Sequence, residues 1–281
     1  MTEGTFEGVG GKRLAWRLWE AEEPVAIVVI VHGLGDHSGR YELVAQSLAA
    51  RGFTVLGFDQ RGHGRSQGIR GHARSFHQLL EDLGYAIQQA KSLGTGLPAF
   101  LWGHSMGGLL VIRYLQGEVV GVQGAVITSP WLATAATVPE WKRRLARILD
   151  RVAPWLALST GMAPETLMRD PHRLKAYRED RLVHDRISPR LYHVVLEEQK
   201  RALANPNLFE TPALFLVPEA DPLVMASATK RFAEAIPGGR ISLIALAGLL
   251  HEPHNEPERG EVFLAAGDWI DRELSVEKPL R

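Results

Sequence analysis

The sequence contains no cysteine among its 281 residues. This absence excludes disulfide bonds, thiolate metal sites and a cysteine nucleophile, and it is compatible with a reducing compartment. The chain also lacks a net charge, because 32 Lys and Arg residues balance 32 Asp and Glu residues. A polyanion therefore finds no overall electrostatic attraction, and we expect no nucleic-acid partner.

Long hydrophobic runs are missing as well. The longest, VAIVVIV at residues 25–31, is far too short to span a bilayer. The opening segment, MTEGTFEGVGG, carries two acids and no apolar core, so it does not resemble a signal peptide. Internal repeats and low-complexity tracts are also lacking. Because we recognise neither a membrane-spanning run nor a signal peptide, we expect a cytoplasmic protein.

What the chain does have is an alternation of apolar strands and helices, with 45% hydrophobic residues. Residues 4–19 alternate around GVGGK and predict a β-hairpin. Continuous apolar strands are expected at 25–31, 53–59, 98–103, 124–128, 213–218 and 241–247, and helices near 40–51, 76–92, 106–116, 225–236 and 260–273. Strands that are apolar on both faces and alternate with helices indicate an α/β fold with a mostly parallel central sheet flanked by helices.

Residues 131–208 interrupt this alternation. They lack strand patterning and carry 14 Lys and Arg residues against 9 Asp and Glu residues. In an open parallel sheet the carboxyl ends of the strands share one edge, and sites form there. We therefore expect residues 1–130 and 209–281 to form the core, and residues 131–208 to form a helical cap inserted over that edge.

The segment Gly103-His104-Ser105-Met106-Gly107 fits the pattern G-x-S-x-G and lies between a predicted strand and a predicted helix. A strand that turns sharply into a helix strains its middle residue and leaves no space for a Cβ on the flanking glycines. Ser105 would then stand exposed at a helix N-terminus, where free N–H groups favour a developing negative charge. The alternative is an ordinary helix-capping serine after a glycine turn.

A serine nucleophile needs a histidine base and a carboxylate that orients it. His251 follows the last predicted strand, and we prefer it to His254 because it lies nearer the strand end. The acid should follow the preceding strand, where we prefer Asp221 to Glu219, although an aspartate before a proline is also common in turns. The chain order Ser105, Asp221, His251 is the order expected for this type of sheet.

Other histidines fit the chemistry less well. His104 adjoins the serine, but so tight a turn should point its side chain away from the hydroxyl. His32 and His63 lie in glycine turns, where structural histidines are frequent. The segment HEPH at residues 251–254 is one residue shorter than the zinc signature H-E-x-x-H, so we expect no metal.

A second glycine turn, VHGLGDHSGRY at residues 31–41, also lies between a strand and a helix. With Asp59 at the end of the next strand it approaches a dinucleotide fingerprint, but the glycine spacing is off by one and a hairpin precedes the strand. The competing interpretation is an oxyanion hole, in which the backbone N–H groups of Leu34 and Met106 bind the charged oxygen of a tetrahedral intermediate. We expect no cofactor.

Together these motifs carry a family resemblance. The segments VHGLGDHSGRY, FDQRGHGRSQG, GHSMGG, EADPLV and HEPHNEPE resemble the monoacylglycerol lipase and lysophospholipase-like branch of the α/β-hydrolases, of the serine aminopeptidase S33 type. The resemblance covers nearly the whole chain and implies an α/β-hydrolase fold with a helical cap over an acyl pocket. It implies Ser105 as nucleophile, Asp221 as acid, His251 as base, and oxyanion donors at Leu34 and Met106.

The sequence departs from the family pattern at three positions near these motifs. Asp36 stands where the family often has glutamate, and Pro218 stands where a glycine commonly precedes the acid. Leu250 stands where an aromatic residue often precedes the histidine. None of these departures touches the triad, but they leave the substrate open.

The expected cap contains one strongly amphipathic segment. In VPEWKRRLARILDRVAPWLAL, residues 138–158, apolar side chains recur at helical spacing while basic side chains crowd the other positions. One interpretation is a cap helix packed on its own domain with a solvated basic face. The other is a helix that contacts an anionic lipid surface and delivers acyl substrates.

The sequence thus predicts a serine hydrolase of carboxylic esters that acts through an acyl-enzyme on a monoacylglycerol or lysophospholipid. The same triad supports short-chain carboxylesterases, perhydrolases, carbon–carbon bond hydrolases and aminopeptidases. An aminopeptidase would need cap acids that hold a substrate ammonium, for which Glu165, Glu179, Glu197 and Glu198 are available. A dinucleotide-dependent oxidoreductase and a non-catalytic binding protein on this fold are the remaining alternatives.

Overall fold

One eight-stranded sheet organises the computed structural model, which describes residues 1–117, 121–135, 138–238 and 240–276. The strands follow the spatial order β1-β2-β4-β3-β5-β6-β9-β10. Their bounds are Thr2–Gly8 (β1), Lys12–Trp19 (β2), Ala26–Val31 (β3), Phe53–Phe58 (β4), Ala99–His104 (β5), Gly124–Thr128 (β6), Ala213–Pro218 (β9) and Ile241–Leu246 (β10). The β1–β2 hairpin and the β2–β4 pair are antiparallel, and all pairs from β4 to β10 are parallel. The predicted hairpin and mostly parallel sheet are therefore confirmed.

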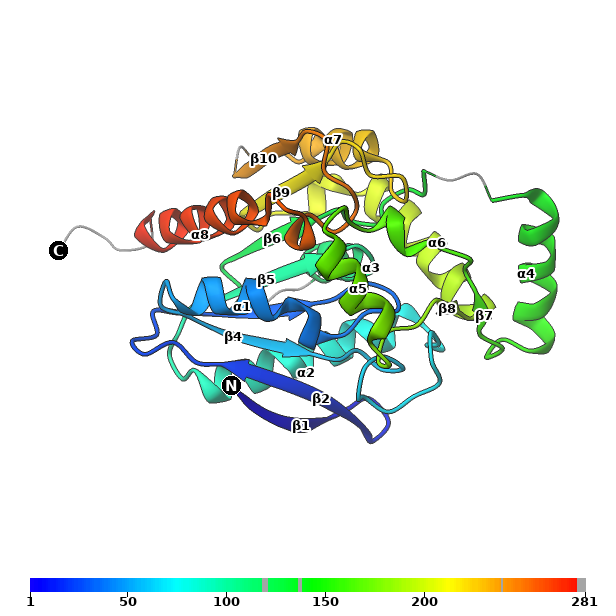
Figure 1. Cartoon of the computed structure of the whole chain (residues 1–281), viewed down its shortest axis with the longest axis horizontal. Helices are drawn as coiled ribbons and strands as arrows, with labels where there is room; N and C mark the ends of the chain where they lie inside the picture. Colours follow the sequence, from blue (N-terminus) through cyan, green and yellow to red (C-terminus); the bar gives the residue numbers. More distant parts are fainter. Residues whose placement is uncertain (118–120, 136–137, 239, 277–281) are drawn as a thin grey trace.

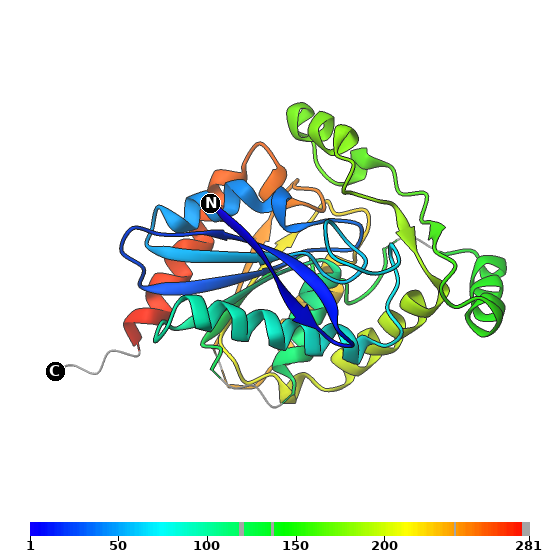
Figure 2. The same cartoon turned by 90° about the horizontal axis from the view of Figure 1, so that it is seen from below.

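Helices cover both faces of this sheet (Figures 1 and 2). Alternate residues of β3 enter two separate apolar clusters, because successive side chains of a strand point to opposite faces. One cluster includes α1 (Glu42–Ala49) and α8 (Arg259–Val276), and the other includes α2 (Phe76–Leu93), α3 (Met106–Leu115) and α7 (Ala226–Ala235). Within the described ranges, no helix is both long enough and apolar enough to cross a membrane.

The chain between β6 and β9 is mainly helical, as its lack of strand patterning predicted. Its elements are α4 (Glu140–Val152), β7 (Leu158–Ser159), α5 (Pro171–Glu179), β8 (Arg186–Ile187) and α6 (Pro189–Ala204), with short 3-10 helices at Pro164–Thr166 (η2) and Pro206–Leu208 (η3). β7 and β8 are two-residue strands that pair antiparallel and that the sequence did not reveal. Side chains of α6 join the apolar cluster of α2 and α3, whereas α4 stands at the edge of the molecule (Figure 1) and buries none of its described residues.

Two further 3-10 helices flank the edge where the parallel strands end. η1 (Ser38–Tyr41) follows β3, and η4 (Pro253–Asn255) follows β10. Because β3, β5, β9 and β10 run parallel, the loops after their carboxyl ends meet at one edge of the sheet. These loops carry Leu34, Ser105, Asp221 and His251 respectively.

Candidate active site

Ser105 occupies the turn between β5 and α3 with a strained backbone, at φ +53° and ψ −118°. The flanking glycines have no room for a side chain. A Cβ on Gly103 would lie 2.8 Å from Cγ2 of Val111, and a Cβ on Gly107 would lie 2.1 Å from the carbonyl oxygen of Val31. The expectation that both positions exclude a Cβ is confirmed, and the capping alternative is wrong in one respect, since the Ser105 side chain makes no capping hydrogen bond.

Three side chains from distant parts of the chain form a hydrogen-bonded series at this turn. The hydroxyl of Ser105 lies 3.0 Å from Nε2 of His251, and Nδ1 of His251 lies 2.7 Å from Oδ2 of Asp221. The other carboxylate oxygen of Asp221 accepts hydrogen bonds from the backbone N–H groups of Leu223 (2.8 Å) and Val224 (3.1 Å). A hydroxyl that contacts an imidazole oriented by a buried carboxylate is the geometry of nucleophilic catalysis.

The rival residues have other partners. Nδ1 of His104 lies 2.9 Å from the hydroxyl of Thr128, and burial together with the nearby His254 and His251 holds the pKa of His104 well below its usual value. His254 stacks on Tyr41, with ring centroids 4.7 Å apart, and burial lowers its pKa to about 4. Glu219 forms an ion pair with Lys230 at the surface. The preferences for His251 and Asp221 therefore agree with the geometry.

The glycine turn after β3 lies directly against Ser105. A Cβ on Gly33 would lie 3.1 Å from the Cβ of Ser105. Met106 opens α3, so its N–H is one of the donors that a helix leaves unused. Among the described residues, neither this N–H nor that of Leu34 has an acceptor; Met106 follows Ser105 in the chain, and Leu34 follows Gly33 and lines the same cavity as Ser105. The pair is thus available to a negatively charged oxygen.

Asp59 is already committed to the protein, which argues against a dinucleotide site. It is buried, and one carboxylate oxygen accepts from the backbone N–H and the hydroxyl of Ser38 while the other accepts from the backbone N–H of Arg65. A ribose hydroxyl would have to displace these donors. In the part of the chain that the structure describes, no group of three or more His, Asp or Glu side chains is arranged to hold a metal ion.

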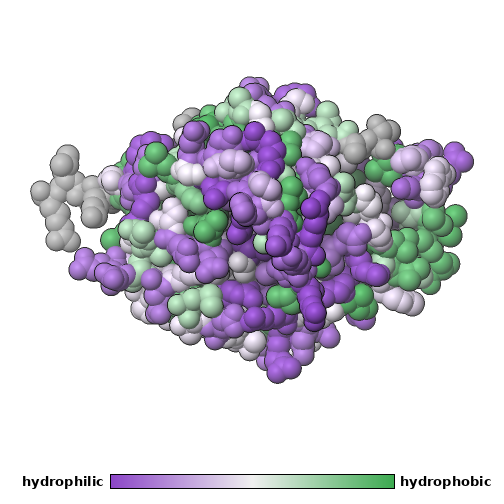
Figure 3. All heavy atoms as spheres, in the orientation of Figure 1, coloured by the Kyte–Doolittle hydropathy of each residue, from purple (hydrophilic) through white to green (hydrophobic). Residues whose placement is uncertain are grey.

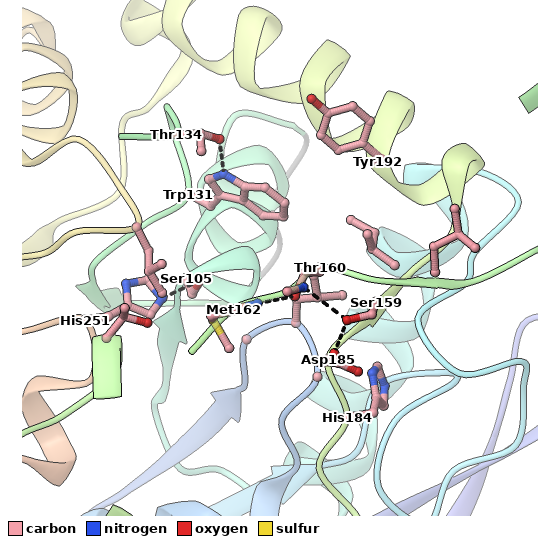
Figure 4. Close-up of a pocket in the computed structure, with 18 of the residues that line it drawn as sticks. Ser105, Trp131, Thr134, Ser159, Thr160, Met162, His184, Asp185, Tyr192 and His251 are labelled. Carbon is pink, nitrogen blue, oxygen red and sulfur yellow. Dashed lines mark hydrogen bonds between the residues drawn. The ribbon is translucent and has the colours of Figure 1, made fainter. Parts of the chain in front are cut away.

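A cavity of about 740 Å³ opens onto Ser105 and His251 (Figure 4). Most of its lining is apolar and comes from the segment between β6 and β9. The apolar lining residues include Val138, Trp141, Leu145, Leu149, Leu158, Met162, Leu167 and Ile187, with Leu223 and Val224 from the core. A cavity of this size and character suits a ligand with a long hydrocarbon chain.

The far side of the cavity is polar. In Figure 4, Ser159, His184 and Asp185 lie across the cavity from Ser105 and His251. The hydroxyl of Ser159 donates to Asp185, and the backbone N–H of Thr160 donates to the carbonyl oxygen of Asp185 at 2.7 Å. The backbone N–H of His184 donates to the carbonyl oxygen of Gly35 at 2.9 Å, which attaches this side to the glycine turn after β3.

Two residues near the serine were missed by the sequence reasoning. Ser129 follows β6 with φ +45°, and its hydroxyl donates to the carbonyl oxygen of His251 at 2.7 Å. Arg40 is buried, and its guanidinium donates to carboxylates of Asp36 and Glu252. Their place in the sequence could have indicated them, because both are polar residues that follow strands ending at the same edge of the sheet.

Comparisons with known proteins point in one direction. A family model described as serine aminopeptidase, S33, matches residues 22–258. A monoacylglycerol lipase from Mycolicibacterium smegmatis is 30% identical over 96% of this chain and 96% of its own. Phospholipase YtpA from Bacillus subtilis is 30% identical over 90% of this chain and 98% of its own. An uncharacterized abhydrolase domain-containing protein from Dictyostelium discoideum is 32% identical, and the chain spans 28% of its length.

Solved structures agree with this result. The crystal structure of a Paleococcus ferrophilus monoacylglycerol lipase is 37% identical, with a TM-score of 0.84 over 92% of this chain and 99% of that one. A soluble variant of monoglyceride lipase from Saccharomyces cerevisiae, solved with a substrate analog, has a TM-score of 0.83 at 21% identity, over 95% of this chain and 94% of its own. These likenesses confirm the fold that the sequence predicted.

The contact between Gly107 and Val31 can be tested by adding one methyl group. Gly107→Ala should lower the free energy of unfolding by about 1–3 kcal/mol or more, because the new Cβ meets backbone that cannot retreat. Gly260→Ala is the matched control, since Gly260 is also the second residue of a helix but has nothing within 4 Å of its Cβ site. That control should change stability by less than about 1 kcal/mol. Urea unfolding followed by circular dichroism measures both, and equal stabilities would contradict the packing argument.

Proposed function

The chain belongs to the serine aminopeptidase S33 family of hydrolases, and from that membership we propose that it hydrolyses carboxylic esters with Ser105 as nucleophile. One observation carries the proposal. The hydrogen-bonded series Ser105–His251–Asp221 opens onto an apolar cavity of about 740 Å³. A nucleophile at the wall of an apolar cavity is suited to an ester with a hydrocarbon chain.

In this proposal the oxygen of Ser105 attacks the ester carbonyl carbon while Nε2 of His251 accepts the hydroxyl proton. Asp221 accepts a hydrogen bond from Nδ1–H and so holds the imidazole in the productive tautomer. The N–H groups of Leu34 and Met106 donate to the tetrahedral oxyanion, a contribution for which one lost donor typically costs about 3 kcal/mol. His251 then protonates the leaving alcohol, and water hydrolyses the acyl-enzyme by the same steps. The chemistry requires no cofactor.

The proposed substrate is a single-chain acyl ester, either a monoacylglycerol or a lysophospholipid. The names of the relatives support this class, since they include monoacylglycerol lipases and a phospholipase. The cavity supports it too, because its apolar lining matches an acyl chain and its polar side at Ser159 and Asp185 can bond hydroxyl groups of a small alcohol.

The glutamates of residues 131–208 do not line the cavity and so supply no site for the free amino terminus of a peptide. The four candidates, Glu165, Glu179, Glu197 and Glu198, form ion pairs with arginine or lysine side chains, and none of them contributes to the lining among the described residues. The acids that do line it are Asp36, Asp185 and Glu252. Asp36 and Glu252 already share the charge of Arg40, so an incoming ammonium gains little from them.

We further propose that residues 131–208 form the cap, with α4 as its lipid-facing edge. Trp141, Leu145 and Leu149 of α4 line the cavity, while the exposed fractions of Ile148 and Val152 are 58% and 67%. Figure 3 shows a hydrophobic area at the end of the molecule where Figure 1 places α4. Basic residues flank this stripe, namely Lys142, Arg143, Arg144, Arg147 and Arg151. An apolar stripe beside cations is suited to an anionic membrane surface.

The cellular setting completes the proposal. We place the enzyme in the cytoplasm, where a chain without cysteine loses nothing to the reducing environment. Its partners are the small-molecule ester and, through α4, the membrane that supplies it. Because the net charge is zero, no overall electrostatic attraction favours a nucleic-acid partner.

Ser105→Ala should abolish ester hydrolysis and covalent labelling by a fluorophosphonate probe, because both reactions need the hydroxyl. Ser227→Ala is the control, as it removes an exposed serine from α7. The thermal unfolding temperature of both variants should match that of the parent protein. Near-full activity of Ser105→Ala, or absence of labelling in the parent protein, would end the proposal.

The substrate class can be tested by a rate profile over p-nitrophenyl esters of increasing chain length, measured beside monoacylglycerols and lysophospholipids. We expect kcat/KM to rise with chain length until the apolar lining is filled, because each buried methylene contributes about 0.8 kcal/mol. A profile that peaks at acetate would favour a short-chain carboxylesterase. Faster turnover of aminoacyl anilides than of any ester would favour the aminopeptidase alternative.

The membrane contact can be tested by co-sedimentation with vesicles at low salt. Phosphatidylglycerol vesicles should retain more protein than phosphatidylcholine vesicles, and the double variant Ile148→Asp, Val152→Asp should lose this retention. Leu264→Asp is the control, since Leu264 is 57% exposed on α8, which lies at the opposite end of the molecule from α4 (Figure 1). Equal retention on both vesicle types would contradict the proposed lipid contact.

A further inference from the structure

A buried cluster of charges lies beside Ser105, and the proposed reaction does not use it. Its centre is Arg40, whose side chain is 8% exposed. Nη1 of Arg40 donates to Asp36 at 2.9 Å, and the two Nη atoms donate to the two carboxylate oxygens of Glu252 at 2.9 and 2.6 Å. The side-chain amide of Asn255 donates a hydrogen bond to a carboxylate oxygen of Glu252 at 2.7 Å.

The cluster joins segments that each carry part of the proposed machinery. Asp36 is two residues from Leu34, one of the proposed oxyanion donors, and Glu252 is the neighbour of His251. These two segments are 212 residues apart along the chain at the Arg40–Glu252 contact. A single guanidinium therefore links the position of an oxyanion donor to the position of the general base.

The cap contributes a third segment. The ring of Tyr177 in α5 lies 4.7 Å from the guanidinium carbon of Arg40, a cation–π contact. Arg173, also in α5, donates to the carbonyl oxygen of Arg40 at 3.3 Å and to the side chain of Asn255 at 2.9 Å. The backbone N–H of Glu252 donates to the carbonyl oxygen of Leu167 at 2.8 Å.

Attraction between opposite charges holds the Arg40 cluster in a fixed geometry. Burial opposes the charge on Arg40, but the carboxylates of Asp36 and Glu252 outweigh burial and hold its pKa well above the usual value. Burial would raise the pKa of Glu252, yet the guanidinium lowers it below the usual value. Each ion therefore needs the others in place, because an unpaired buried charge is strongly unfavourable. The planar guanidinium fork matches the carboxylate of Glu252 in two bonds, which lysine cannot reproduce.

We propose that Arg40 is a positioning residue that sets the distance between the Leu34 turn and His251, and that Glu252 is its partner in this role. The inference rests on the proposed function, since it assigns the cluster to the same site. An oxyanion hole acts mainly in the transition state, so its misplacement lowers kcat and leaves substrate binding largely intact. The Arg40 cluster supplies the fixed geometry that this requires.

The test compares Arg40→Lys and Glu252→Gln with the control Arg51→Lys. Arg51 also binds two carboxylates, but these belong to Asp268 and Asp271 of α8 and lie away from the site. Competent sites are counted as the fraction of protein that a fluorophosphonate has labelled at completion, so that kcat refers to competent enzyme. Both cluster variants should lower kcat by about ten- to a hundredfold, with KM within about threefold of the parent value. The rate of Ser105 labelling by a fluorophosphonate should fall in parallel, and Arg51→Lys should match the parent protein.

Each alternative result has a distinct meaning. A kcat per competent site within about twofold of the parent value in both cluster variants would overturn the inference. A smaller fraction of protein labelled at completion, with unchanged turnover per labelled site, would also overturn it, because the cluster would then serve folding alone. A rise in KM with kcat unchanged would assign the cluster to substrate binding and contradict positioning. Failure of the proposed function is distinguishable, since the parent protein itself would then neither hydrolyse esters nor label at Ser105.

Discussion

The close approach of α3 to β3 is the constraint on which the site depends. Gly107 stands so near the carbonyl oxygen of Val31 that no larger residue fits. This contact forces the chain to turn sharply after His104, and Ser105 absorbs the strain with a positive φ. In the same region the Cβ of Ser105 lies 3.1 Å from where a Cβ on Gly33 would stand, so Ser105, the helix N-terminus and the Leu34 turn are fixed together. Backbone packing, before any side-chain chemistry, thus determines where a tetrahedral oxyanion would lie.

The parallel sheet then brings loops that are distant in sequence to one edge. Asp221 and His251 follow adjacent strands, β9 and β10, and meet 2.7 Å apart. The carboxylate is held by two backbone N–H groups of its own loop, and the His251 carbonyl is held by Ser129 at the end of β6. Each proposed catalytic group is therefore positioned by its own loop or by another loop that leaves the same edge of the sheet, as expected where parallel strands end together.

Sequence patterns predicted the fold and the proposed triad for identifiable reasons. Buried strands such as β3 are apolar throughout, which periodicity detects, and Gly103 and Gly107 mark the turn around Ser105. The Arg40 cluster escaped because its pairing is a property of the folded chain: Arg40 and Glu252 stand inside the quoted motifs VHGLGDHSGRY and HEPHNEPE, but they are far apart in sequence and neither motif indicates the pairing. The two-residue strands β7 and β8 escaped because such short pairings leave no periodicity. Local rules find elements and turns, whereas long-range ion pairs need the tertiary structure.

The proposed cap contacts the rest of the chain unevenly, and this asymmetry bears on how a lipid ester would reach Ser105. On the α5 side, Arg169 binds Glu256 and Glu258, Arg259 binds Asp170, and Arg173 contacts the Arg40 cluster. On the α4 side, Asp150 pairs with Arg190 and His193 of α6, which is itself part of the proposed cap, and the outer stripe of α4 is exposed. Displacing α5 together with residues 169 and 170 would break these ion pairs and hydrogen bonds to the loops after β3 and β10, whereas displacing α4 would break few polar contacts. Access that preserves the proposed catalytic geometry is therefore favoured along α4, where the cavity lining and the exposed apolar stripe share one helix.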